Sequence, residues 1–222
     1  MPNVDGSSIE AMLQVEQEFQ NCLPMMGLHP CSVDENYKEA LKEVDDWFAK
    51  RTFFGVGETG IDLYWDKTWI EEQKICFDHQ IRLAEELDLP VIIHSRDSLD
   101  LTIQMVEERQ NGKLKGIFHC FTGTKDQARR IIDTGFLMGI GGVLTYKNSN
   151  LPEVIREISL HSLVLETDAP YLPPVPYRGK KNEPSYITKV LEKLAEIKGM
   201  EKEEVAAITT SNAIKLFGLT PK

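Results

Sequence analysis

The sequence predicts an α/β protein of the TIM-barrel type, in which parallel strands alternate with helices. Short apolar runs bounded by Gly and Pro recur along the chain, as is typical of strands buried on both faces of a parallel sheet. Amphipathic stretches of helical length separate these runs. Four of the runs also end in a residue that can bind a metal ion. These residues are Glu58, His94, His119 and Asp168.

Strands and helices can be assigned in order along the chain. The expected strands are residues 23–30, 53–60, 89–96, 116–123, 136–143 and 163–170. The expected helices are residues 35–50, 68–88, 98–111, 125–134, 151–158, 184–198 and 201–217. Repeated βα units require right-handed crossovers and a parallel sheet. No linker or low-complexity tract interrupts them, so the sequence predicts a single domain over residues 1–222.

Several helix ends carry local signals. Thr68 with Glu71, and Thr124 with Gln127, have the spacing of a capping box, in which each side chain binds an N–H group of the first turn. Gly199 stands where a helix stop is favoured. These signals agree with the helix boundaries expected above.

The strand count falls short of a closed barrel. Residues 1–5 look like the tail of a seventh strand, whereas a (β/α)₈ barrel needs eight strands and typically about 250 residues. The chain has 222 residues, so one complete βα unit and most of a further strand are missing. The sequence therefore predicts a barrel truncated at its N-terminus, with about six full strands plus the tail of a seventh. Such a barrel is either open or a truncated product.

Charge and cysteine content narrow the possible partners. The net charge of −10 disfavours non-specific binding of DNA or RNA, so a nucleic acid would need a local basic cluster or a bound metal. The four cysteines form no CxxC pair, which indicates reduced thiols. No secretion signal and no membrane-spanning run occur, so we expect a cytoplasmic protein that does not bind membranes.

The four strand-end residues suit a metal centre with one or two ions. Carboxylate and imidazole ligands together suit zinc, manganese or iron. Magnesium is also a candidate ion, although it prefers more oxygen ligands. Glu58 lies among glycines that allow close approach of the backbone, and it is expected to bridge two metals. The alternative for Glu58 is a solvated loop carboxylate. For His94 and His119 the alternative is a structural histidine.

Asp168 is the expected catalytic residue, together with Glu58. An aspartate at this position can bind metal and accept the proton of the attacking water, although a turn aspartate is the alternative. Glu166, two residues earlier, is expected to support the metal ligands. Period-two alternation predicts that Cys120 points away from the side that His119 faces. Asp62 is expected to support its loop rather than to bind metal.

Substrate contacts are predicted at the same ends of the strands. His29 is expected either to contact substrate or to be structural. Basic residues from three loops are expected to form a phosphate-binding rim around the site. The alternative for each single residue is an ordinary charge on the protein surface. These residues are Arg96, Lys147, Arg178, Lys180 and Lys181. The rings of Tyr64, Trp65 and Tyr146 are expected either to stack on bases or to pack within the protein.

Seven segments of the chain resemble the TatD family of metal-dependent deoxyribonucleases, which are amidohydrolase-like barrels. They are GLHP (27–30), GVGETGID (55–62), VIIHSRD (91–97), FHCFTG (118–123), ETDAPYLPP (166–174), RGKKNEPSYI (178–187) and TSNAIKLFG (210–218). The resemblance implies a dinuclear site in which Glu58 bridges, His94 and His119 complete one metal, and Asp168 serves the other. The family also takes two ligands from a His-x-His pair on its first strand, which this sequence lacks. One ion is therefore favoured over two.

The resemblance implies metal-dependent hydrolysis of DNA phosphodiester bonds, with 3′–5′ exonuclease action on single strands or 3′ ends. A second hypothesis is a metallohydrolase that resembles a D-aminoacyl-tRNA deacylase. A third is an inactive, truncated binding protein whose unpaired strand edges favour self-association. No nucleophile elbow, P-loop or GxGxxG motif occurs, so covalent and nucleotide-cofactor chemistries have no support.

Overall fold

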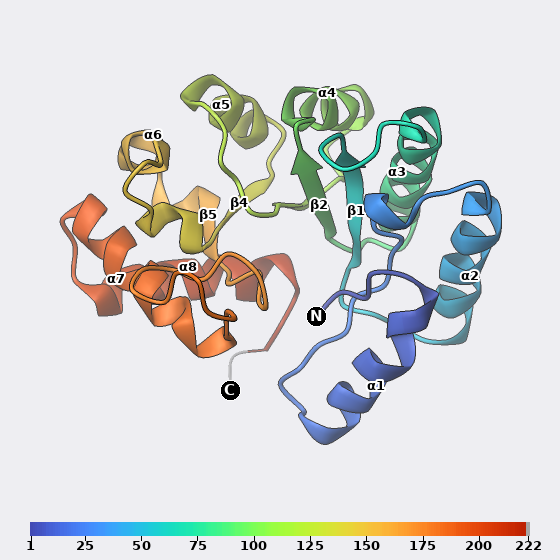
Figure 1. The fold of residues 1–222 in the computed structure, drawn as a ribbon, viewed down its shortest axis with the longest axis horizontal. Helices are drawn as coiled ribbons and strands as arrows, with labels where there is room; N and C mark the ends of the chain where they lie inside the picture. The colour runs from blue at the N-terminus through green and yellow to red at the C-terminus, as the bar shows by residue number, and fades with distance from the viewer. Residues whose placement is uncertain (221–222) are drawn as a thin grey trace. The chain divides into compact units, whose positions relative to one another are not determined.

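The computed structural model describes residues 1–220, and the chain divides into two compact units, Met1–Ile117 and Phe118–Lys222. The described residues contain five strands, β1 to β5 (Figure 1). Strand β1 pairs with β2 in parallel, and β4 pairs with β5 in parallel. The α/β class predicted from the sequence is confirmed. The single-domain assignment stays a prediction.

The first unit is built around β1 (Val56–Asp62) and β2 (Val91–Arg96). Its other elements are α1 (Ile9–Glu18), α2 (Tyr37–Lys50), α3 (Ile70–Glu86) and α4 (Leu99–Arg109), with β3 (Gly116–Phe118) at the boundary between the units. Figure 1 shows α3 running alongside β1. Val56, Phe77 and Ile93 have no exposed surface, so the interface between these elements forms part of the core.

Buried amides on α3 hold β1 in place. The Gln80 side chain accepts a hydrogen bond from the Leu28 N–H at 2.8 Å and donates one to the Thr59 hydroxyl at 2.7 Å. The Gln73 side chain accepts a hydrogen bond from the Asp62 N–H at 2.9 Å. Because a buried polar group without a partner is costly, these bonds fix the position of the strand relative to the helix.

One expected strand is reduced to two isolated bridges. Residues 23–30 pair only through the parallel bridges Pro2 to Met25 and Met26 to Val56. The next N–H groups along the segment bind side chains, because Gly27 donates to the Asn3 side chain and Leu28 to Gln80. A strand ladder cannot form where side chains take the backbone donors. Within residues 1–220 there are therefore five ladder strands where the sequence predicts six.

The second unit contains β4 (Leu137–Ile140) and β5 (Leu163–Leu165). Its helices are α5 (Lys125–Asp133), α6 (Leu151–Glu157), α7 (Ile187–Lys198) and α8 (Lys202–Leu216). Strand β4 is shorter than expected, since a 3₁₀ turn begins at Gly142.

Two of the three helix-end predictions are confirmed. Thr124 and Gln127 form the predicted capping box of α5, and Gly199 ends α7 in the left-handed conformation with φ 63°. The predicted capping box at Thr68 is wrong, because Thr68 does not cap α3. Helix α3 begins at Ile70 with Trp69 as its N-cap, one residue later than that signal predicts, and the Thr68 N–H donates to the side chain of Asp66 instead.

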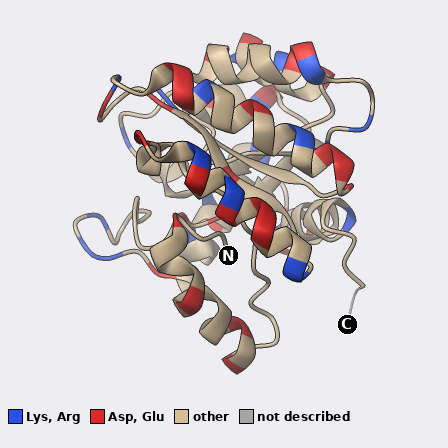
Figure 2. Cartoon of the chain, turned by 90° about the vertical axis from the view of Figure 1, so that its right-hand side faces the viewer, with Lys and Arg blue, Asp and Glu red and all other residues tan. Residues whose placement is uncertain are grey.

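The outer faces of the helices are polar. Figure 2 shows acidic and basic residues interspersed along them, and pairs such as Lys42 with Asp46 on α2 lie 2.6 Å apart. Among the described residues, no helix is both long enough and apolar enough to cross a membrane. The cytoplasmic location stays a prediction.

Candidate metal centre

Glu58 and His94 come together in the first unit. Glu58 lies in β1 and His94 in β2, where Gly60 is the register partner of His94. The Nδ1 atom of His94 is 2.9 Å from Oε1 of Glu58. Gly60 permits this close pairing of the strands, because a Cβ atom there would overlap the carbonyl oxygen of His94. The backbone of Gly60 also has φ +143°, which side-chain-bearing residues rarely adopt.

Asp62 lies on the other side of the His94 ring. Its Oδ2 atom is 2.9 Å from Nε2 of His94, and its Oδ1 atom accepts hydrogen bonds from the N–H groups of Tyr64 and Trp65 at 2.9 and 3.3 Å. Burial works to raise the pKa of Asp62, but these hydrogen bonds outweigh it and lower the pKa below its usual range. Asp62 supports its loop, as expected, and it also orients His94.

His29 completes the group in the first unit. Its Nε2 atom is 3.6 Å from Oε1 of Glu58, and the ring centres of His29 and His94 are 4.5 Å apart. Its Nδ1 atom accepts a hydrogen bond from the Cys31 N–H at 3.1 Å. An accepting Nδ1 places the proton of a neutral imidazole on Nε2, so that this nitrogen is a donor. The arrangement suits a substrate contact better than a metal ligand.

Cys31 lies beside these carboxylates but stays a thiol. Partial burial raises its pKa to about 12, and the charges of Asp62 and Glu58 act in the same direction. The raised pKa keeps this group protonated at neutral pH.

His119 and Asp168 come together in the second unit. Oδ1 of Asp168 is 3.7 Å from Nε2 of His119. The other ring nitrogen, Nδ1, is 3.1 Å from a carboxylate oxygen of Glu166, which also accepts the Cys120 N–H at 2.7 Å. Gly139 leaves room for that carboxylate, because a Cβ atom there would overlap it. Glu166 thus binds the ring nitrogen of His119 that faces away from Asp168, in the supporting role that the sequence predicts.

The predicted orientation of Cys120 is wrong. Potential ligand atoms of His119, Cys120 and Asp168 all lie within 4.8 Å of one another. The reason is local backbone geometry, since Cys120 has φ 48° and leaves the extended conformation on which period-two alternation depends. Asp168 also has positive φ, at 55°.

The predicted substrate residues divide between the units. In the first unit, the guanidinium carbon of Arg96 is 3.7 Å from the centre of the Tyr64 ring. In the second unit, the guanidinium carbon of Arg178 is 3.8 Å from the centre of the Tyr146 ring. Lys147 follows Tyr146 in the sequence. Burial raises the pKa of Tyr146 and the charge of Asp168 adds to this, while Arg178 opposes both. The Arg178–Tyr146 pair therefore lies within electrostatic reach of Asp168.

The donor chemistry fits a divalent metal. Each unit pairs a histidine with an acidic ligand candidate, and a second carboxylate holds the other nitrogen of the same ring. In many metal sites one ring nitrogen of a histidine binds the metal and the other donates to a carboxylate. That supporting carboxylate fixes the tautomer of the ring. The sequence suggested Glu166 as such a support. It missed the contact between Asp62 and His94, which the even spacing from Glu58 could have revealed.

Comparison with known proteins identifies a family of metal-dependent hydrolases. The family of TatD related DNases matches residues 1–218. The metal-dependent hydrolase YabD of Bacillus subtilis is 39% identical over 96% of this chain and 84% of YabD. The 3′-5′ ssDNA/RNA exonuclease TatD of Citrobacter rodentium is 30% identical over 94% of this chain and 82% of that enzyme.

Solved structures show the same fold. The TatD homologue YjjV of Escherichia coli matches with a TM-score of 0.93 and 30% identity, over 99% of this chain and 86% of YjjV. A lactonase from Deinococcus radiodurans matches with a TM-score of 0.64 at 16% identity, which shows a common TIM-barrel-type fold alone. The carboxylate and histidine pairs, the family match over nearly the whole chain and the relatives that share it lead to one conclusion: this chain belongs to the TatD family of metal-dependent hydrolases.

Proposed function

We propose that the chain hydrolyses phosphodiester bonds of DNA as a 3′–5′ exonuclease. The contact of His94 with Glu58 on one side and Asp62 on the other carries the proposal, because it is the arrangement of an oriented metal ligand. The likeness to the Citrobacter rodentium enzyme, which is named a 3′-5′ ssDNA/RNA exonuclease, supports DNA as the substrate.

Each unit contributes its own candidate metal ligands. Glu58 and His94 would bind metal in the first unit, and His119 and Asp168 would bind metal in the second. Zinc or manganese suits these imidazole and carboxylate donors better than magnesium does. A divalent ion in such a site polarises the phosphoryl group and lowers the pKa of bound water.

The side chains of the protein supply the remaining steps. Asp168 accepts a proton from the attacking water, as a carboxylate in hydrogen-bond reach of the nucleophile can. Arg96, Lys147 and Arg178 offset the charge that develops on the phosphoryl oxygens. His29 donates a hydrogen bond to substrate through Nε2, as its tautomer allows. The sugar oxygen leaves from the opposite side of phosphorus.

The decisive experiment follows products from a 5′-labelled single strand of DNA with zinc, manganese or magnesium added. We expect a ladder that shortens from the 3′ end. The double variant His94→Ala with His119→Ala should abolish cleavage, whereas His79→Ala should retain it, because His79 lies on α3 and pairs with Asp45. Undiminished cleavage by the double variant would refute the site. Release of the amino acid from D-aminoacyl-tRNA, with DNA left intact, would favour the deacylase hypothesis instead.

A further inference from the structure

Two exposed aromatic rings lie beside the Glu58–His94 pair. Tyr64 and Trp65 lie in the loop after β1, separated from the strand by Leu63, and they are 53% and 71% exposed. Their ring centres are 4.8 Å apart in an edge-to-face arrangement. Single exposed aromatic residues are common on protein surfaces, but adjacent large rings held together are typical of a binding surface.

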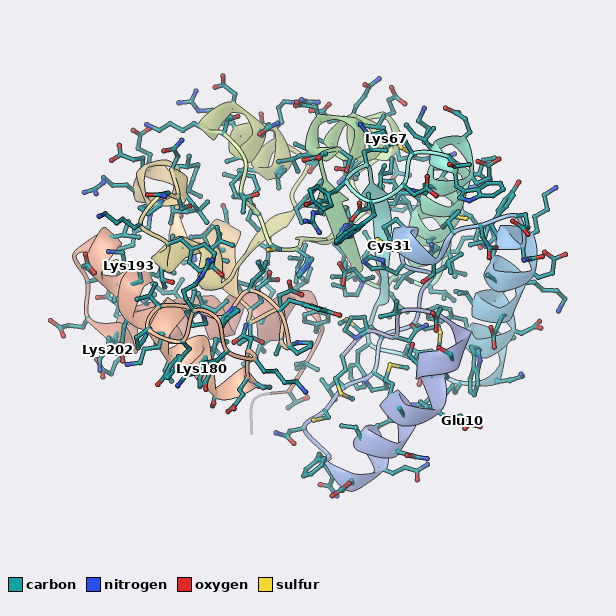
Figure 3. The ribbon with its side chains drawn as sticks, in the orientation of Figure 1. Glu10, Cys31, Lys67, Lys180, Lys193 and Lys202 are labelled. Carbon is teal, nitrogen blue, oxygen red and sulfur yellow. The ribbon has the colours of Figure 1, made fainter. Side chains whose placement is uncertain are left out.

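The loop that carries these rings is fixed to the candidate metal centre. The N–H groups of Tyr64 and Trp65 both donate to Oδ1 of Asp62, whose other oxygen is 2.9 Å from His94. The Leu63 N–H donates to the carbonyl of Arg96 at 2.9 Å. One carboxylate therefore orients a metal-ligand candidate and positions both rings. Lys67, labelled in Figure 3, marks the same loop.

Arg96 adds a positive charge to the ring pair. Its guanidinium carbon lies 3.7 Å from the centre of the Tyr64 ring and 5.3 Å from that of Trp65. A guanidinium stacked on a ring keeps its edge for phosphate, which it can bind through two parallel hydrogen bonds. The loop thus offers ring surface for a base and a cation for the adjoining phosphate. Both requirements of a single-strand binding site are present.

We infer that Tyr64, Trp65 and Arg96 form a stacking site for an unpaired nucleobase of the strand that is cleaved. The inference rests on the proposed function and narrows its substrate to single strands and frayed ends, because a base inside a duplex already has both faces stacked. Charge alone would not provide this preference in a chain whose net charge is −10.

Binding to two strands of equal charge tests the stacking site. We would measure the fluorescence anisotropy of labelled oligothymidylate and of a strand of the same length that lacks bases, with a chelator present to prevent cleavage. Wild-type protein should bind oligothymidylate at least about 5-fold more tightly, since stacking contributes from about 5-fold to about 100-fold per base. Trp65→Ala should remove this difference, and Trp65→Phe should keep most of it.

The matched control is Phe19→Ala, which removes an aromatic residue that is 48% exposed at the end of α1. It should leave binding of both strands unchanged, and circular dichroism should show that each variant is folded. Equal wild-type affinity for the two strands would overturn the inference. So would equal weakening of both strands by Trp65→Ala, or no binding of either strand up to about 100 μM, the weak end of non-specific binding.

A cleavage assay on the same two strands with metal present tests the stacking site and the proposed nuclease activity separately. If the base preference holds but no phosphodiester is cleaved, the stacking site stands and the nuclease assignment fails. If both strands are cleaved equally well and Trp65→Ala changes neither rate, the nuclease assignment stands and the stacking site fails.

Discussion

At the scale of single residues, the candidate metal centre depends on carboxylates that stand behind the ligands. Asp62 contacts Nε2 of His94, whereas the ligand candidate Glu58 contacts Nδ1 of the same ring. Glu166 contacts Nδ1 of His119, whereas the ligand candidate Asp168 lies near Nε2. Each also accepts backbone N–H groups, from Tyr64 and Trp65 or from Cys120. A supporting residue of this kind sets the direction of a ligand and the course of the nearby loop at once, so its loss should weaken the site without removing any ligand.

Asp62→Asn tests that support in the first unit. The amide keeps the size of the side chain but takes the charge away from Nε2 of His94, so metal affinity should fall by about 10- to 100-fold. Titration calorimetry with manganese measures the change. The control is Asp66→Asn in the same loop, where the carboxylate accepts the Thr68 N–H, and it should bind metal as the wild type does. Equal affinity in both variants would show that Asp62 does not orient His94.

Gly139→Ala tests the support in the second unit. The added methyl group would overlap the Glu166 carboxylate and displace it from His119 and Cys120. We expect a loss of stability of about 1–3 kcal/mol, as for other overpacked sites, together with a loss of hydrolase activity. Gly141→Ala is a matched control, because its methyl group would meet Glu166 at an ordinary 3.7 Å. Similar melting temperatures for the two variants would contradict this account.

At the scale of secondary structure elements, α3 serves as the brace of β1. Gln80 is fully buried, and its single side chain joins three elements of the first unit through Leu28, Thr59 and the backbone of α3. Glu58 is the neighbour of Thr59 on that strand. Movement of the strand relative to α3 would therefore move a candidate metal ligand, so packing of the helix and geometry of the site are coupled.

Gln80→Leu should lower the free energy of unfolding by about 2–3 kcal/mol, because it leaves the buried Leu28 N–H and Thr59 hydroxyl without partners. Urea denaturation measures the change. Gln104→Leu on α4 is the comparison, since that side chain bonds only to Glu108 on an exposed helix face, and its effect should stay within about 0.5 kcal/mol. An equal fall of the free energy of unfolding in both variants would mean that the hydrogen bonds of Gln80 do not stabilise the protein.

At the scale of the whole molecule, the regular parts were predictable and the exceptions arise from distant side chains. Short apolar runs located β1 and β2, and amphipathic periodicity located the helices. The reduction of residues 23–30 to bridges was not predictable from that pattern, since it depends on Asn3 and Gln80, which lie 24 and 52 residues from their partners. Cys120 was misplaced because its left-handed backbone carries no sequence signal comparable to glycine.

Metal binding should stabilise the folded chain as a whole. A ligand that binds only the native state adds about 2.7 kcal/mol when its concentration is 100 times its dissociation constant. Manganese added after chelation should therefore raise the melting temperature measured by scanning calorimetry. The rise should disappear in the double variant Glu58→Gln with His94→Ala and persist in His79→Ala, whose ring pairs with Asp45. If the double variant gained as much stability as the wild type, the ion would bind elsewhere, and the contact between Glu58 and His94 would be structural.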